Sequence, residues 1–274
     1  MRGDHKESFK DKRAKLATLK KEKIMVKKFF AEFLATAMLV LVGCGAAMAF
    51  TFAGMAGTPA ATVGIAAAFG ISIVILAYTV GRVSGGHANP AVSFAKALNK
   101  EISWKECGIY CCAQVVGAFF GSLLLAMVMW AWKTGVSGAN GVAEVFYKNT
   151  DNMKAFVEGK AAFMPFMLAT MAEMGLTFLF VILVLGVTNK KEWSNIAGLV
   201  IGLALFGVHI VGIPLTGTSV NPARALSALV FSMFNGDKVG VKALTLIPTI
   251  VGPLMGAFAA ASTYKAFFGK EKAE

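Results

Sequence analysis

The sequence predicts an all-α membrane protein with six transmembrane helices and two re-entrant half-helices, arranged as an inverted repeat of three plus three spans. Of its 274 residues, 57% are apolar and 15% charged, and the mean hydropathy is +0.66. Soluble domains average about 25% charged residues, so this composition is typical of a membrane protein. Apolar runs recur at the length that crosses roughly 30 Å of hydrocarbon, about 20 residues. The second half of the chain also repeats the motifs of the first.

The spans are separated by polar or charged segments and are expected at about 29–50, 61–81, 108–131, 163–187, 195–214 and 241–264. We expect a basic N-terminal tail over 1–28, a transmembrane domain over 29–267 and a short C-terminal tail over 268–274. Within the domain, repeat one covers 29–132 and repeat two covers 163–267. The first apolar run is too long for the apolar region of a signal peptide, so no cleavable signal is expected.

The net charge of +12 is distributed unevenly across the predicted topology. The N-terminal side carries 20 Lys and Arg residues, 11 of them in the tail, and the opposite side carries 7. This asymmetry predicts that both termini are cytoplasmic, and it favours contact with anionic membrane lipid over nucleic-acid binding. The tail itself is expected to be either a helix on the inner leaflet or a disordered basic segment.

Three motif pairs define the internal repeat. "AEFLAT" at 31–36 is similar to "AEMGLT" at 172–177, "GGHANPAVSFA" at 85–95 to "GTSVNPARALS" at 217–227, and "QVVGAFFG" at 114–121 to "TIVGPLMG" at 249–256. The distance along the chain is similar for all three pairs, so the loops vary while the order of elements holds. Because each half holds an odd number of spans, the second half must enter the membrane from the opposite side. Inverted repeats of this kind form their sites near the bilayer midplane.

An Asn-Pro-Ala box follows the second span of each half and opens an apolar stretch of only 10 to 14 residues. Such a stretch is too short to cross a bilayer, which indicates a re-entrant half-helix. Asparagine is a good N-cap, and proline is tolerated at the first helical position. Both half-helices are therefore expected to begin inside the protein, with their N-termini meeting near the midplane. The box residues are Asn89, Pro90 and Ala91 in the first half, and Asn221, Pro222 and Ala223 in the second.

With its paired boxes in the contexts "SGGHANPAV" and "SVNPAR", and an Ala-Glu pair early in each half, the sequence resembles the aquaporin (major intrinsic protein) family. The resemblance runs from about 29 to 267 and is most similar to the bacterial-type orthodox water channels. It implies the aquaporin fold, with tilted spans, one pore in each protomer, a homotetramer and no cofactor.

Arg224 is the only formal charge between Glu192 and Asp237. A charge at the centre of a span costs about 2.5–3.5 kcal/mol on the insertion scale, which is tolerable beside a wet pore. The resemblance implies that Arg224 belongs to a selectivity filter on the extracellular side, together with Phe69, His209 and Thr218. The alternatives are an arginine that reaches the interface, a histidine between packed helices and a lipid-facing phenylalanine.

A filter of these four residues is narrow and combines one apolar wall with hydrogen-bonding groups, which favours water over a carbon chain. Glycerol-conducting relatives usually replace the histidine with a small residue and have aspartate after the arginine, whereas this chain has His209 and Ala225. Glycerol, hydrogen peroxide and ammonia remain alternative permeants. Two helix N-termini at the midplane, with their asparagine amides, would exclude protons and other cations.

Two acids lie inside spans, Glu32 and Glu173. They could relay protons in a secondary transporter. The favoured interpretation is that they, with His87, support the re-entrant loops by hydrogen bonding. No nucleophile, base and metal group converges on one face, so an enzyme is not expected. Cys107 and Cys111 share a helix face but lack further ligands, so no metal is expected either.

Overall fold

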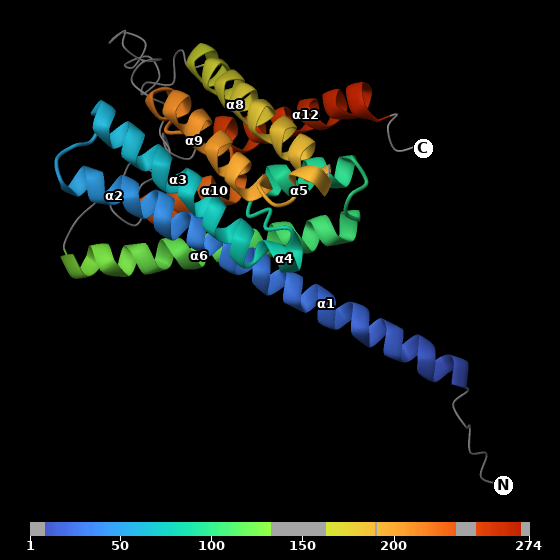
Figure 1. Ribbon diagram of the computed structural model, residues 1–274. Coiled ribbons are helices and arrows are strands. Elements are labelled where there is room, and N and C mark those ends of the chain that lie inside the picture. The colour runs from blue at the N-terminus through green and yellow to red at the C-terminus, as the bar shows by residue number, and fades with distance from the viewer. Residues whose placement is uncertain (1–8, 133–162, 190, 234–244, 270–274) are drawn as a thin grey trace.

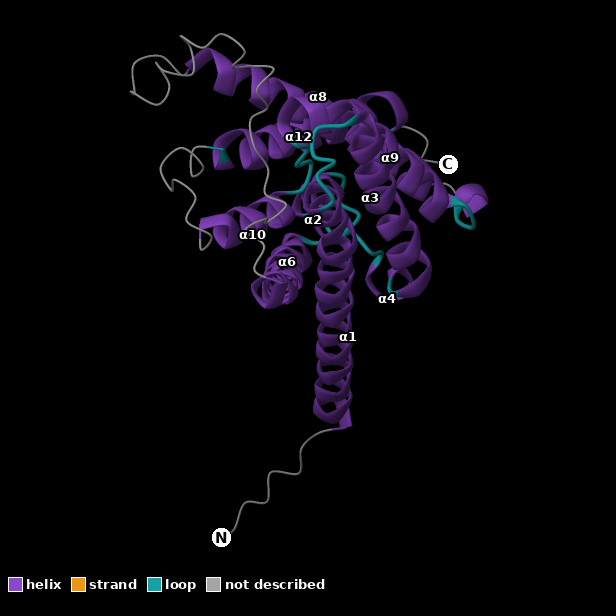
Figure 2. Ribbon diagram, turned by 90° about the vertical axis from the view of Figure 1, so that its left-hand side faces the viewer, coloured by secondary structure: helices purple, strands orange, loops and turns teal. Residues whose placement is uncertain are grey.

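The computed structural model describes residues 9–132, 163–189, 191–233 and 245–269, and every regular element in these ranges is helical (Figures 1 and 2). The segment between the two expected repeats, 133–162, lies outside the described residues. The described part of the chain contains five helices that are long and apolar enough to cross a membrane: Lys12–Phe52, Pro59–Thr79, Trp104–Val128, Phe166–Asn189 and Ala197–Thr216. The sixth expected span begins outside the described residues and continues as a π turn, η4 (Ile247–Val251), and α12 (Gly252–Phe268). The predicted fold class is confirmed.

The first half contains α1 (Phe9–Leu39), the π turn η1 (Val40–Cys44), α2 (Gly45–Phe52), α3 (Pro59–Thr79), α4 (Gly81–Ser84), α5 (Pro90–Leu98) and α6 (Trp104–Trp132). The second half contains α8 (Phe163–Asn189), the 3₁₀ turn η3 (Lys191–Trp193), α9 (Ala197–Thr216), α10 (Pro222–Met233), η4 and α12. The short helices α5 and α10 are the two half-helices. Each begins at the proline of its Asn-Pro-Ala box, as the capping pattern predicts.

The long helices pack in three main pairs: α1 with α6, α8 with α12, and α3 with α9. The first two pairs join the first and third spans of each half. Glycines permit these close approaches: a Cβ atom on Gly121 would lie 2.8 Å from the Ala37 carbonyl oxygen, and one on Gly252 would lie 2.8 Å from that of Thr170. Small residues at helix crossings let backbones touch, which is a main source of packing energy in lipid.

The basic tail is helical where the structure describes it. α1 starts at Phe9, well before the predicted start of the first span, and it projects from the bundle as one continuous helix (Figures 1 and 2). Its residues Asp11 to Lys23 are mostly Lys, Leu, Ala and Glu, which are good helix formers. Described tail side chains such as Leu16 are exposed. The described part of the tail is therefore a helix, but it continues the first span instead of forming a separate segment.

Candidate functional site

The two Asn-Pro-Ala boxes meet in the interior and are tied to each other by their asparagine amides. Asn89 Nδ2 donates to the Val220 carbonyl over 2.7 Å, and Asn221 Nδ2 donates to the Ala88 carbonyl over 2.7 Å. Each asparagine also caps its own half-helix: Asn89 Oδ1 accepts from Ala91 N, and Asn221 Oδ1 accepts from Ala223 N. The capping hydrogen bond and the hydrogen bond to the opposite loop together fix the orientation of each asparagine side chain.

The residue before each asparagine has left-handed backbone, with φ of 49° at Ala88 and 43° at Val220. This conformation is uncommon for any residue with a side chain and costs more for β-branched valine. It turns each carbonyl toward the opposite asparagine. The strained loops must therefore be held by other groups.

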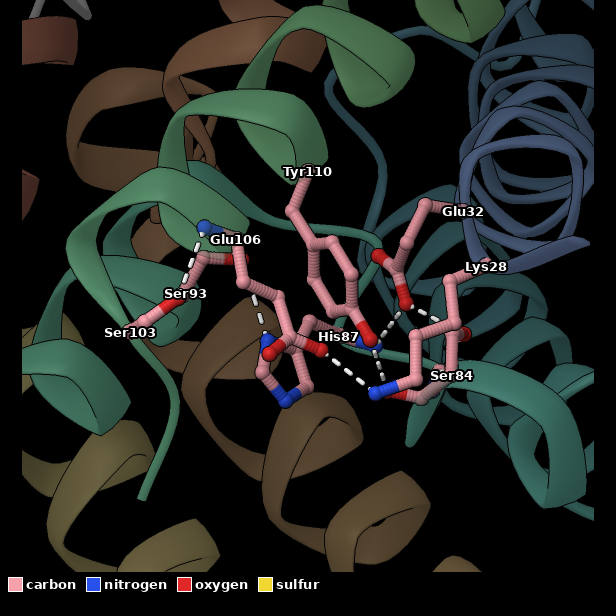
Figure 3. Close-up of polar contacts among 9 residues, drawn as sticks. Lys28, Glu32, Ser84, His87, Ser93, Ser103, Glu106 and Tyr110 are labelled. Atoms are coloured by element: carbon pink, nitrogen blue, oxygen red, sulfur yellow. Dashed lines mark hydrogen bonds and ion pairs between the residues drawn. The ribbon is translucent and has the colours of Figure 1, made fainter. Parts of the chain in front are cut away.

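Glu32 holds the first loop (Figure 3). Its carboxylate is fully buried and accepts from His87 N over 2.9 Å and from Ala88 N over 2.8 Å. Ser84 Oγ donates to it over 2.6 Å and Gln114 Nε2 over 2.7 Å. Four donors satisfy a buried carboxylate that would otherwise be very costly to desolvate.

Glu173 holds the second loop in the same way. It is fully buried and accepts from Ser219 N and Val220 N, each over 2.8 Å, and from Thr216 Oγ1 over 2.5 Å. Both carboxylates thus face the backbone N–H groups of strained loops, and in each loop one of these belongs to the left-handed residue.

His87 contacts the first half-helix and also lines a cavity into which Asn89 and Asn221 face. Its Nδ1 lies 3.0 Å from Ser93 Oγ, and its ring meets that of Tyr110 edge-on with centroids 5.1 Å apart (Figure 3). Tyr110 in turn donates to the Ser84 carbonyl over 2.6 Å. The described part of the second half has no equivalent ring network, because Ser219 stands at the position of His87 when the two boxes are aligned.

Phe69, His209, Thr218 and Arg224 are brought together next to the boxes, and none of them is more than 3% exposed. The Phe69 and His209 rings are stacked with centroids 4.3 Å apart, and Arg224 Cζ lies 5.2 Å from the centroid of Phe69. Arg224 Nη1 donates to the Thr218 carbonyl over 3.3 Å. The left-handed φ of 53° at Thr218 is part of the loop conformation that presents this oxygen.

The hydrogen bond of His209 fixes which ring nitrogen carries the proton. Nδ1 lies 2.9 Å from the Leu205 carbonyl oxygen, which can only accept, so Nδ1 donates. In the neutral ring, Nε2 is then an acceptor. Nε2 is buried and makes no hydrogen bond to the described residues, and His209 lines the cavity. It is therefore placed to accept from a molecule in the cavity.

A cavity runs past both clusters, with Asn89, Asn221, Phe69, His209 and Arg224 all in its wall. Four further apolar residues line it beside the predicted Phe69 and were not predicted: Leu39, Ile73, Phe180 and Leu205. The internal repeat pairs these four residues but does not indicate that they line a cavity. Phe180 is the counterpart of Leu39 when the two Ala-Glu motifs are aligned, and Leu205 is that of Ile73 when the boxes are aligned. A passage with one apolar side and a row of fixed polar groups can hold a small polar molecule without binding it tightly.

Known proteins match most of the chain. Residues 18–264 match the family described as Major intrinsic protein. The chain is 34% identical to Aquaporin Z of Rhodopseudomonas palustris over 234 residues, 84% of this chain and 90% of that protein. It is 34% identical to Aquaporin Z of Brucella melitensis over 250 residues, 90% of this chain and 100% of that protein. In structure it is similar to an aquaglyceroporin from Plasmodium falciparum, with a TM-score of 0.72 and 21% identity, over 89% of this chain and 96% of that one.

Proposed function

Since the chain belongs to the major intrinsic protein family, we propose that it is a passive water channel that excludes protons and ions. The observation that carries this proposal is the cavity joining the asparagine pair to Phe69, His209 and Arg224. The relatives that are 34% identical are named Aquaporin Z, a water-channel name. The likeness to an aquaglyceroporin, at 21% identity, concerns the fold alone.

In this proposal, Phe69, His209, the Thr218 carbonyl and Arg224 form the selectivity filter. The guanidinium repels cations, and His209 Nε2 accepts a hydrogen bond from a passing water. Farther in, the Asn89 and Asn221 amides donate to the water, while the N-termini of α5 and α10 add about half a positive charge each. A water molecule that accepts hydrogen bonds from both asparagine amides has both lone pairs engaged and points its hydrogens away from them. This orientation interrupts proton transfer along the single row of waters in the pore.

The assembly and topology belong to the same proposal. We expect a homotetramer with one pore in each protomer, in the cell membrane, with both termini in the cytoplasm and no cofactor. The positive-inside asymmetry supports the orientation. Because α1 continues in line with the first span, only its basic residues nearest the span, such as Lys27, would then lie beside the anionic inner leaflet, where each Lys or Arg near the surface contributes about 1 kcal/mol.

Two alternatives remain. Other small neutral solutes, namely glycerol, hydrogen peroxide and ammonia, are candidate permeants of the same pore. A proton-coupled secondary transporter would need free carboxylates, whereas both Glu32 and Glu173 accept hydrogen bonds from loop N–H groups in the folded chain. This observation favours a structural role for the two acids over a proton relay.

Osmotic shrinkage of proteoliposomes tests the proposal. A channel accelerates shrinkage without saturation and without any ion or proton gradient. A rate that requires a proton gradient and saturates with solute would favour the transporter instead.

A further inference from the structure

The first span contains a π turn next to the cluster proposed as the filter. In η1 (Val40–Cys44) the side chain of Val42 faces outward at 37% exposed, while Gly43 is buried. A π turn inserts one extra residue into a helix and is frequently found at functional sites. Here it places Gly43 against the ring of Phe69.

There is no room for a side chain at Gly43. A Cβ atom built there would overlap the Phe69 ring at Cδ1 and Cε1 and lie 2.6 Å from Cζ, well inside the 3.0 Å that real Cβ atoms keep. One edge of the Phe69 ring therefore rests directly on the backbone of the first span.

The other neighbours of the ring leave it little freedom. His209 is stacked on it at 4.3 Å between centroids, Arg224 Cζ lies 5.2 Å away, and Phe69 is 2% exposed. The space that adjoins the ring is the cavity that Phe69 itself lines. A ring displaced from Gly43 would therefore move into the passage.

We infer that Gly43 is a positioning residue that sets the width of the filter by fixing the Phe69 ring against the first span. The inference rests on the proposed water-channel function. Replacing Gly43 with alanine narrows the passage, although alanine is the better helix former by about 1 kcal/mol. Gly45 provides a matched control on the same span, because a Cβ atom there meets only the flexible end of Leu125, at 3.3 Å.

The test compares Gly43→Ala and Gly45→Ala, each with and without Phe69→Val, in proteoliposomes with equal amounts of folded protein. Water permeability and its activation energy are measured by stopped-flow light scattering. We expect Gly43→Ala to lower water permeability roughly tenfold and to raise the activation energy by the corresponding amount, about 1.4 kcal/mol. Gly45→Ala should leave both unchanged. Phe69→Val removes the ring that a Cβ atom at position 43 would overlap. Gly43→Ala should therefore have no further effect on water permeability in the Phe69→Val background.

A purely structural role for Gly43 would reduce the number of folded channels but leave the activation energy of permeation unchanged. That result would overturn the inference, as would normal conduction by folded Gly43→Ala. If Gly43→Ala alone does not fold, the double variant Gly43→Ala with Phe69→Val provides the test. Water conduction by the double variant equal to that of Phe69→Val alone supports the inference. Failure of the double variant to fold, or weaker conduction, contradicts it. Absence of water conduction by the unaltered protein would instead refute the proposed function.

Discussion

Gly70 and Gly202 touch each other where α3 packs against α9. A Cβ atom on either glycine would lie 2.7 Å from the carbonyl oxygen of the other. The two glycines occupy equivalent positions when the two Asn-Pro-Ala boxes are aligned. This reciprocal contact is what a two-fold axis between inverted repeats requires, and it sets how closely the two halves approach.

Gly202→Leu should therefore separate α3 from α9 and disturb the cavity between the halves. Overpacking of a tight contact typically costs about 1–3 kcal/mol. We expect lower thermal stability in detergent and loss of most water permeability. Gly207→Leu on the same helix is the control, because nothing lies within 4 Å of a Cβ atom there. Equal effects of the two substitutions would show that the α3–α9 contact does not matter.

Glu173→Gln should destabilise the second re-entrant loop. Both carboxylate oxygens accept hydrogen bonds, and the amide NH₂ of glutamine would face a backbone N–H in place of one of them. An unsatisfied buried group of this kind costs about 1–3 kcal/mol. Thermal stability and water permeability should both fall, while the exposed Glu192→Gln should change neither. Normal stability and water conduction with loss only of proton-coupled uptake would support the transporter interpretation instead.

The combination of His209→Gly and Phe69→Ala should widen the proposed filter and admit glycerol. It removes two stacked rings that line the cavity while leaving Arg224 in place. Glycerol-driven re-swelling of proteoliposomes measures the effect. Phe258→Ala, at an exposed site on α12, is the control and should not admit glycerol. If the double variant folds and conducts water but still excludes glycerol, the filter lies elsewhere.

Arg224→Val, added to that widened variant, should increase leakage of protons and small cations. The guanidinium supplies a fixed positive charge at the passage, so its removal lowers the barrier for any cation. A pH-sensitive dye inside the vesicles reports proton entry under a potassium diffusion potential. Unchanged leakage would mean that the half-helix N-termini alone repel cations.

Much of the fold could be predicted because membrane spans and half-helix caps depend on local sequence. Apolar length identifies a span, and Asn-Pro fixes the start of a half-helix. Aligning the two boxes also pairs Ile73 with Leu205, but both are ordinary apolar residues of a span until folding places them in the wall of one cavity.

Other features depend on tertiary contacts that no local pattern reveals. The left-handed backbone at Val220 runs against the preference of valine and exists because Glu173 and Asn89 hold both sides of it. A lysine such as Lys96 would be expected in solvent, but it is 5% exposed because Glu101 binds its ammonium group from the same half and Thr188 binds it from the other half. A π turn at Gly43 likewise has no sequence signature of its own.

The most direct test of the central claim is stopped-flow light scattering on proteoliposomes, first under an impermeant osmotic step and then under a glycerol gradient. The account predicts shrinkage much faster than in protein-free liposomes, a low activation energy and no glycerol re-swelling. Folded protein that shrinks vesicles no faster than lipid alone, or that re-swells them rapidly with glycerol, would contradict a water-selective channel.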